Sequence, residues 1–98
     1  FLAFTDDDCR PDSGWLTAFA ERFAAAGDCA VGGKSVNAVA GNVCSEASQV
    51  LLDYLYERFN AVPGRAQLLI SNNFALPAAM FRAIGGFDTG FPKAAAED

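Results

Sequence analysis

The sequence predicts an α/β fold, because short apolar runs with strand character alternate with segments whose apolar residues recur at helical spacing. Hydrophobic residues make up 52% of the 98-residue chain and charged residues 19%, which favours a packed core over disorder. Three consecutive acids follow the first apolar run. In open α/β sheets, ligands bind at the carboxyl ends of strands, so this position is a candidate site.

The first third of the chain is predicted as a strand, a turn and a helix. Residues 1–5 form a buried strand that ends at the acidic triplet. Asp12 or Ser13 is in position to cap the helix that follows, and Gly27 is typical of its C-terminus. We interpret the aromatic side chains at helical spacing in this helix as core rather than as a platform for sugar stacking.

The middle of the chain is predicted as short strands followed by a long helix. Residues 29–33 form a short strand, residues 34–42 are strand-like, and residues 43–60 are helical. The apolar stripe of this helix comprises Val50, Leu51, Tyr54, Leu55 and Phe59. We expect the stripe to be core, or to face a part of the protein outside this chain.

Proline and glycine residues separate the predicted elements in the last third of the chain. The elements predicted there are a break at 61–64, a strand at 67–71, a turn or strand edge at 72–73 followed by 74–76, a short helix from Pro77 through Ile84, and a loop over 87–98. Gly85 and Gly86 are expected to end the short helix.

Composition excludes several classes of function. Seven basic and twelve acidic residues give a net charge of −5, which argues against binding of nucleic acid because that requires a basic face. The chain has no histidine, so Ser-His-Asp and Cys-His nucleophiles and His-containing zinc sites are excluded within it. Three cysteines without a CxxC pair indicate free thiols in a reducing compartment. We therefore expect a cytoplasmic protein, with the inner face of the membrane as the alternative for a full-length protein that carries an anchor.

Both ends of the sequence suggest a segment of a longer protein. The chain begins inside an apolar run and stops at Asp98 without a polar tail. Part of a sheet exposes apolar edges, so we expect marginal stability or self-association through the exposed sheet edge.

The acidic triplet has a pattern that suits a divalent cation. In an extended or turning segment alternate side chains point the same way, which places Asp6 and Asp8 on one side and Asp7 on the other. Two carboxylates on one side repel each other, and a divalent cation removes that repulsion. Oxygen-only ligands favour hard cations, so Mg²⁺ or Mn²⁺ is the natural candidate. The alternative is that the acids cap a helix and remain hydrated.

Three stretches together resemble the family 2 glycosyltransferases. These stretches are FLAFTDDDCRPDSGWL, with a DxD motif after an apolar strand; SNNFALPAAMFRAIGGFDTGF, with a short helix and GGFD; and the closing Glu97-Asp98, at the place of the family's ED motif. The resemblance implies a GT-A fold, the Rossmann-like fold of nucleotide-diphospho-sugar transferases. It further implies that residues 1–98 are the C-terminal half of a catalytic domain whose nucleotide-binding N-terminal half lies outside this chain.

The resemblance implies roles for the residues on the donor side. Asp8 would be the principal metal ligand, and Asp6 would bind the metal directly or contact the ribose of the nucleotide. Asp7, the variable middle position of the motif, would be the third residue on the donor side.

The resemblance also implies roles on the acceptor side. Asp98 would be the general base that takes the proton from the acceptor hydroxyl, and Glu97 would help to position the acceptor or the base. Asn73 would line the acceptor side. Pro77 stands near the place where the family often has a basic residue.

These roles imply an inverting, metal-dependent glycosyltransferase of the hexosyltransferase type. Its donor would be a nucleotide-diphosphate sugar, of UDP type, and its acceptor a carbohydrate or a lipid-linked molecule, as in polysaccharide biosynthesis. We expect the 98-residue chain by itself to be inactive. The alternatives are a Mg²⁺-dependent haloacid-dehalogenase-like phosphohydrolase, disfavoured by Arg10 where that family has Thr or Val, and a non-catalytic α/β binding module.

Overall fold

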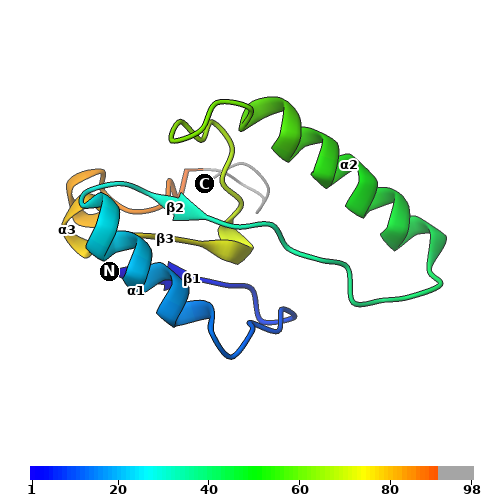
Figure 1. Ribbon diagram of the computed structural model, residues 1–98. Helices are drawn as coiled ribbons and strands as arrows, with labels where there is room; N and C mark the ends of the chain where they lie inside the picture. Colours follow the sequence, from blue (N-terminus) through cyan, green and yellow to red (C-terminus); the bar gives the residue numbers. More distant parts are fainter. Residues whose placement is uncertain (91–98) are drawn as a thin grey trace. The chain divides into compact units, whose positions relative to one another are not determined.

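The computed structural model describes residues 1–90, and these fall into two compact units (Figure 1). The first unit combines residues 1–33 with the described residues from Ile70 onward, and the second is Lys34–Leu69. The carboxylates that close the sequence, Glu97 and Asp98, lie outside the described residues.

The first unit contains a three-stranded sheet with the order β1-β3-β2. Its strands are β1 (Leu2–Phe4), β2 (Val31–Gly32) and β3 (Phe74–Leu76). Both outer strands pair with β3 in antiparallel register, with Ala75 opposite Ala3 on one side and Val31 on the other. The predicted α/β class is therefore confirmed as a small mixed α/β arrangement, whose strands lie within the predicted ranges 1–5, 29–33 and 74–76.

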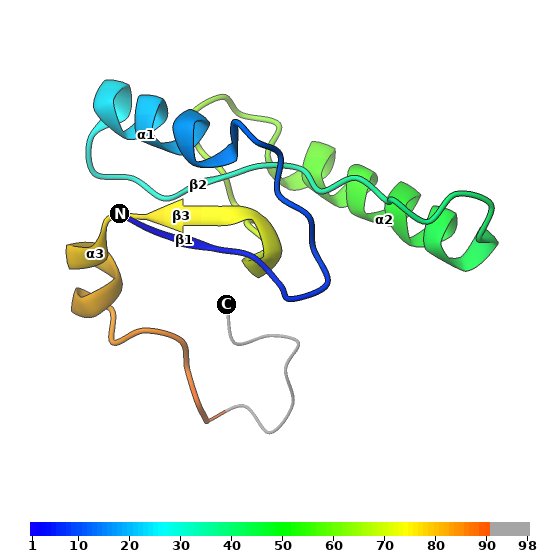
Figure 2. The same ribbon diagram turned by 90° about the horizontal axis from the view of Figure 1, so that it is seen from below.

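Helices lie on opposite sides of this sheet (Figure 2). Helix α1 (Trp15–Ala26) packs on one face, where the ring of Phe1 contacts those of Phe19 and Phe23 at centroid distances of 6.5 and 5.0 Å. Phe19 is buried, and Trp15 meets its ring edge-on at 5.2 Å. The prediction that the aromatic residues of this helix form core is confirmed for Phe19, while Trp15 and Phe23 are half-buried beside it.

Helix α3 (Ala78–Ala83) and the turn after it cover the other face with an aromatic cluster. Alternation along β1 turns Phe4 to this side, where it stacks on its cross-strand partner Phe74 at 4.9 Å. Phe81 and Phe87 also contact Phe4, at 5.2 and 5.1 Å. The central strand of the sheet, β3, contains the buried residues Ala75 and Leu76.

The predicted helix ends are right, but the predicted cap of α1 is wrong. Gly27 follows α1 with φ of 68°, and Gly85 and Gly86 follow α3 with φ of 87° and 80°, conformations that favour glycine. The residue before α1 is Gly14, and no side chain caps this helix. Asp12 instead accepts a hydrogen bond from the Gly14 amide at 2.9 Å, which makes a turn before the helix begins.

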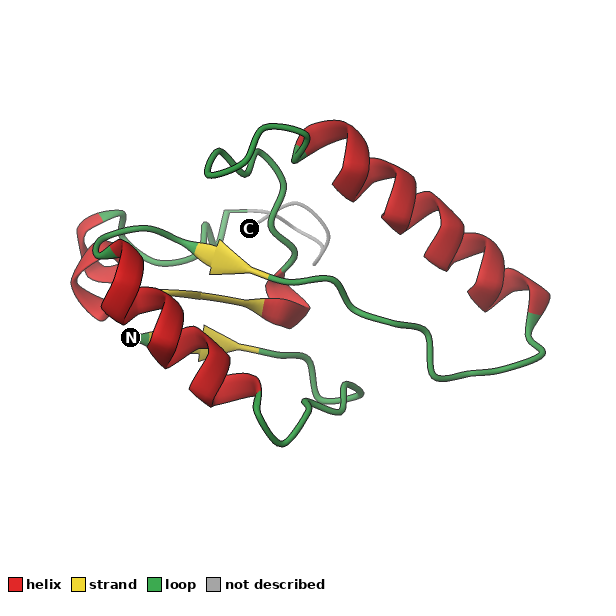
Figure 3. Cartoon of the chain, viewed as in Figure 1, coloured by secondary structure: helices red, strands yellow, loops and turns green. Residues whose placement is uncertain are grey.

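The second unit consists of helix α2 (Val43–Phe59) and the loops on either side (Figure 3). Asn42 caps the helix by accepting from the Ser45 amide at 3.1 Å. The strand expected over residues 34–42 is absent from the described structure, because side chains take its backbone groups. Gln49 Oε1 accepts from the Asn37 amide at 2.6 Å, and Asn37 Oδ1 accepts from the Val39 amide at 2.9 Å.

The strand expected over residues 67–71 is also wrong, for the same physical reason. Asn60 Oδ1 accepts from the amides of Gln67 and Leu68 at 2.9 and 3.0 Å, and Asn60 Nδ2 donates to the Leu68 carbonyl at 2.9 Å. These groups are therefore satisfied without a sheet partner. The 3-10 helix η1 (Ser71–Asn73) then leads directly into β3.

The apolar stripe predicted on α2 is not a core in this structure. Val50, Leu51 and Tyr54 are 69%, 58% and 60% exposed, and α2 contains no buried residue. The polar side chains of Ser45 and Gln49 make the contacts to the preceding loop instead. None of the helices in residues 1–90 has the length and apolar character that crossing a membrane requires.

Candidate metal centre

A tight turn at the end of β1 shapes the acidic triplet. The strand ends at Phe4, and two residues later the Asp6 carbonyl accepts a hydrogen bond from the Cys9 amide at 3.2 Å. This i to i+3 bond closes a β-turn, in which aspartate is a favoured first residue. The turn, rather than continued strand alternation, brings the side chains of Asp6 and Asp8 toward each other.

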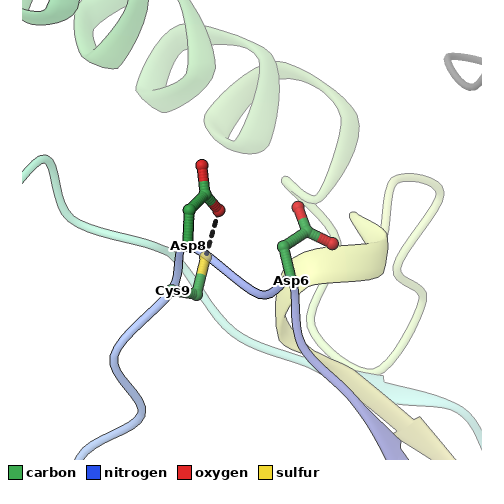
Figure 4. Close-up of side chains that lie close together, drawn as sticks. All are labelled: Asp6, Asp8 and Cys9. Carbon is green, nitrogen blue, oxygen red and sulfur yellow. Dashed lines mark hydrogen bonds between the residues drawn. The ribbon is translucent and has the colours of Figure 1, made fainter.

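Three potential ligands converge at this turn. A carboxylate oxygen of Asp6, one of Asp8 and the Cys9 sulfur all lie within 4.8 Å of one another. Both carboxylates extend to the same side of the loop, and the Cys9 thiol donates to Asp8 Oδ1 at 3.7 Å (Figure 4). Asp7 does not belong to this group. The structure thus brings together the two acids that the sequence pattern placed on one side.

The donors fit a hard divalent cation. Ligands on opposite sides of Mg²⁺ are about 4.2 Å apart, because each metal–oxygen bond is about 2.1 Å long. Neighbouring ligands around such an ion are only about 3 Å apart. At spacings of up to 4.8 Å, these exposed side chains must therefore rotate closer together, or contact the ion through a bound water, to hold it. Two carboxylates suit Mg²⁺ or Mn²⁺, whereas the Cys9 thiol adds a softer ligand that Mg²⁺ does not prefer.

The carboxylates of Asp6 and Asp8 are exposed and lack a cationic partner in the described part of the chain. The salt bridges in that part of the chain belong to Lys34, which pairs with Asp53 at 3.4 Å and with Glu57 at 3.8 Å. Within residues 1–90 no helix is capped by the triplet, since Gly14 precedes α1 without a side-chain cap. The helix-capping alternative is therefore wrong for the described structure, while hydration of the acids remains compatible with it.

Asn73, predicted to lie on the acceptor side, has a structural partner. Its Oδ1 accepts a hydrogen bond from the Trp15 indole at 2.8 Å, and its carbonyl accepts from the Gly33 amide at 3.0 Å. A Cβ atom on Gly33 would lie 3.0 Å from Asn73 Nδ2. Asn73 therefore packs closely against the end of β2.

Two features of the site were missed by reasoning from the sequence. Cys9 joins the ligand group, and the signal for it was its position directly after the triplet, inside the same turn. The bond between Trp15 and Asn73 joins residues 58 positions apart, and no local pattern indicates such a pair.

Comparisons of the chain with protein-family models, with curated proteins and with solved structures found no match in any of the three.

Proposed function

We propose that this chain is the C-terminal half of the catalytic domain of an inverting, metal-dependent glycosyltransferase with a GT-A fold. The donor is a nucleotide-diphosphate sugar of UDP type, and the acceptor is a hydroxyl of a carbohydrate or a lipid-linked molecule. The observation that carries the proposal is the convergence of Asp6 and Asp8 at the end of a strand, on one side of a turn.

The charge of the turn supports this choice of ligand. Three of the twelve acidic residues of the chain lie in this turn, namely Asp6, Asp7 and Asp8. Their negative charges would repel a diphosphate that has no bound cation. Asp8 would hold a Mg²⁺ or Mn²⁺ ion, with Asp6 as second ligand or as partner of the ribose, and the charge of the ion would offset that repulsion. When bound, the ion neutralises the charge that develops on the diphosphate leaving group.

The acceptor side of the proposal depends on residues outside the described part. Asp98 accepts the proton of the acceptor hydroxyl as the new bond to the sugar carbon forms and the bond from that carbon to the diphosphate oxygen breaks. A carboxylate with an ordinary pKa near 4 cannot ionise a hydroxyl beforehand, so it acts as a general base during the transfer. Attack opposite the leaving group inverts the sugar carbon. Glu97 positions Asp98 or the acceptor.

Binding of UDP to the intact enzyme tests the donor side. Calorimetry should detect UDP binding in Mn²⁺ and none in EDTA, and Asp8→Asn should abolish the Mn²⁺-dependent part. Asp28→Asn is the matched control, because Asp28 is also an exposed aspartate but lies before β2 rather than in the turn. UDP binding that is unchanged in Asp8→Asn would contradict the metal assignment.

Turnover separates the acceptor side from the donor side. Asp98→Asn should retain Mn²⁺-dependent UDP binding and lose transfer of the sugar. Hydrolysis of a simple phosphate ester by the intact enzyme, without UDP binding, would favour the phosphohydrolase alternative. The 98-residue chain alone should not turn over a nucleotide sugar, because the residues that bind the nucleotide lie in the other half of the proposed domain.

A further inference from the structure

We propose that Trp15 and Asn73 are positioning residues for the metal centre: the hydrogen bond between their side chains holds the loop that carries Asp6 and Asp8, and so raises the affinity for the ion. This inference rests on the proposed metal site. It adds that two residues that do not bind the ion raise the affinity of the site for it. The argument depends on where the two ends of residues 5–14 are attached.

The first end of the loop is attached through β1. Phe4, the last residue of β1, is paired with Phe74 in the antiparallel ladder. Their rings also stack, with centroids 4.9 Å apart and planes 15° apart. The loop therefore leaves the sheet from a residue that is fixed by both backbone pairing and side-chain packing.

The second end is attached through the first residue of α1. Trp15 Nε1 donates to Asn73 Oδ1 at 2.8 Å, in a partly buried position, and the Trp15 ring packs edge-on against Phe19. Asn73 directly precedes Phe74 in the chain. The two ends of the loop are thus held by consecutive residues, at the point where η1 becomes β3.

Asn73 is itself held firmly enough to act as an anchor. Its amide donates to the Ile70 carbonyl at 3.0 Å within η1, and its carbonyl accepts from the Gly33 amide at 3.0 Å. Gly33 leaves so little room that a Cβ there would lie 3.0 Å from Asn73 Nδ2. The side-chain oxygen that Trp15 contacts is therefore fixed with respect to β2 and β3.

The loop between these anchors has few other constraints. Its hydrogen bonds in the described structure are local: the Asp6–Cys9 turn, the bond from the Cys9 thiol to Asp8, and the bonds that Asp12 accepts from Gly14 and Trp15. Releasing the Trp15 end would let the turn sample more conformations. Binding an ion would then cost more entropy, because both carboxylates must be brought to one point.

The test compares Mn²⁺ affinity in four forms of the 98-residue chain, measured by electron paramagnetic resonance. Trp15→Phe keeps an aromatic ring, although a smaller one, and removes the donor, and Asn73→Ala removes the acceptor. Each should weaken Mn²⁺ binding by about three- to tenfold, the range expected for one hydrogen bond. The double variant should bind no more weakly than the weaker of the two single variants, because both remove the same bond.

Two further variants separate positioning from general stability. Asn73→Asp keeps the acceptor for the indole, so its Mn²⁺ affinity should stay above that of Asn73→Ala. Asn60→Ala is the matched control, because Asn60 also holds a loop through its side chain, with three hydrogen bonds in the second unit. It should lower stability and leave Mn²⁺ affinity unchanged.

The single tryptophan provides a readout that does not require the ion. Its indole N–H gives one NMR signal, whose exchange with solvent should become faster in Asn73→Ala. A chain that binds Mn²⁺ equally well with and without Trp15→Phe, or an indole exchange rate unchanged by Asn73→Ala, would overturn this inference alone. An unsubstituted chain that binds no Mn²⁺ would overturn the metal site, and this inference with it.

Discussion

Replacing Phe4 by alanine would remove the ring at the centre of the aromatic cluster that supports the acidic turn. Phe4 contacts Phe74, Phe81 and Phe87, with centroids between 4.9 and 5.2 Å away. It is also the last residue of β1, immediately before the loop that carries the carboxylates. We therefore expect Phe4→Ala to destabilise the first unit and to loosen the start of that loop.

The magnitude follows from burial and from the lost ring contacts. A fully buried Phe→Ala substitution costs about 3–5 kcal/mol, and the half-buried position of Phe4 reduces this transfer and cavity contribution to roughly half. Loss of the ring pairs adds about 0.5–1.5 kcal/mol. We expect a loss of about 2–4 kcal/mol in the free energy of unfolding, which is a large share of the ~5–15 kcal/mol typical of a domain.

Urea unfolding followed by Trp15 fluorescence measures this loss, because the only tryptophan lies in the first unit. Phe4→Leu should recover more than half of it, since most of the apolar volume is kept. Phe59→Ala is the matched control: Phe59 is 45% exposed and lies in the second unit, so its effect on the Trp15 transition should stay within about 0.5 kcal/mol. A loss below about 1 kcal/mol for Phe4→Ala, or one equal to that of Phe59→Ala, would refute the reasoning.

Two other substitutions test the fold. Ala75 is fully buried between its partners Ala3 and Val31, so Ala75→Leu should overfill the centre of the sheet. We expect it to lower the free energy of unfolding by about 1–3 kcal/mol, measured by the same urea transition. An unchanged urea midpoint would contradict that packing. Asn42→Ala removes the cap of α2 and should cost about 1 kcal/mol, seen as a lower helical signal in circular dichroism on heating. Cys44→Ala, at an exposed position in the first turn of the helix, is its control and should leave the signal unchanged. A cap variant that melts like the control would contradict the capping role.

The elements with strong local signals could be predicted from the sequence. Helical spacing located α1 and α2, terminal glycines marked the ends of α1 and α3, and the apolar run before the triplet located β1. The segments at 34–42 and 67–71 could not be predicted, because side chains satisfy some of their backbone groups. Gln49 and Asn60 do so from outside the segments, and Asn37 does so from within the first one. Local composition does not distinguish such loops from strands.

The candidate site was predictable in part, for similar reasons. Asp6 and Asp8 are close in sequence, and both the expected alternation and the observed turn place them on one side. The contacts that hold the two ends of their loop come from a distant segment. Asn73 accepts a hydrogen bond from Trp15, and the Phe74 ring stacks on that of Phe4. Tertiary contacts of this kind carry no signature in the residues that surround the triplet.

Titration of the 98-residue chain with Mn²⁺, followed by electron paramagnetic resonance, tests the central claim most directly. If the turn holds a cation, the chain should bind one Mn²⁺ ion, and the double variant Asp6→Asn/Asp8→Asn should not. A paired Asp53→Asn/Glu57→Asn variant removes two acids of the second unit, half-buried Asp53 and exposed Glu57, and should bind as the unsubstituted chain does. Mn²⁺ binding that is absent from the unsubstituted chain, or that survives in the Asp6→Asn/Asp8→Asn variant, would contradict the account.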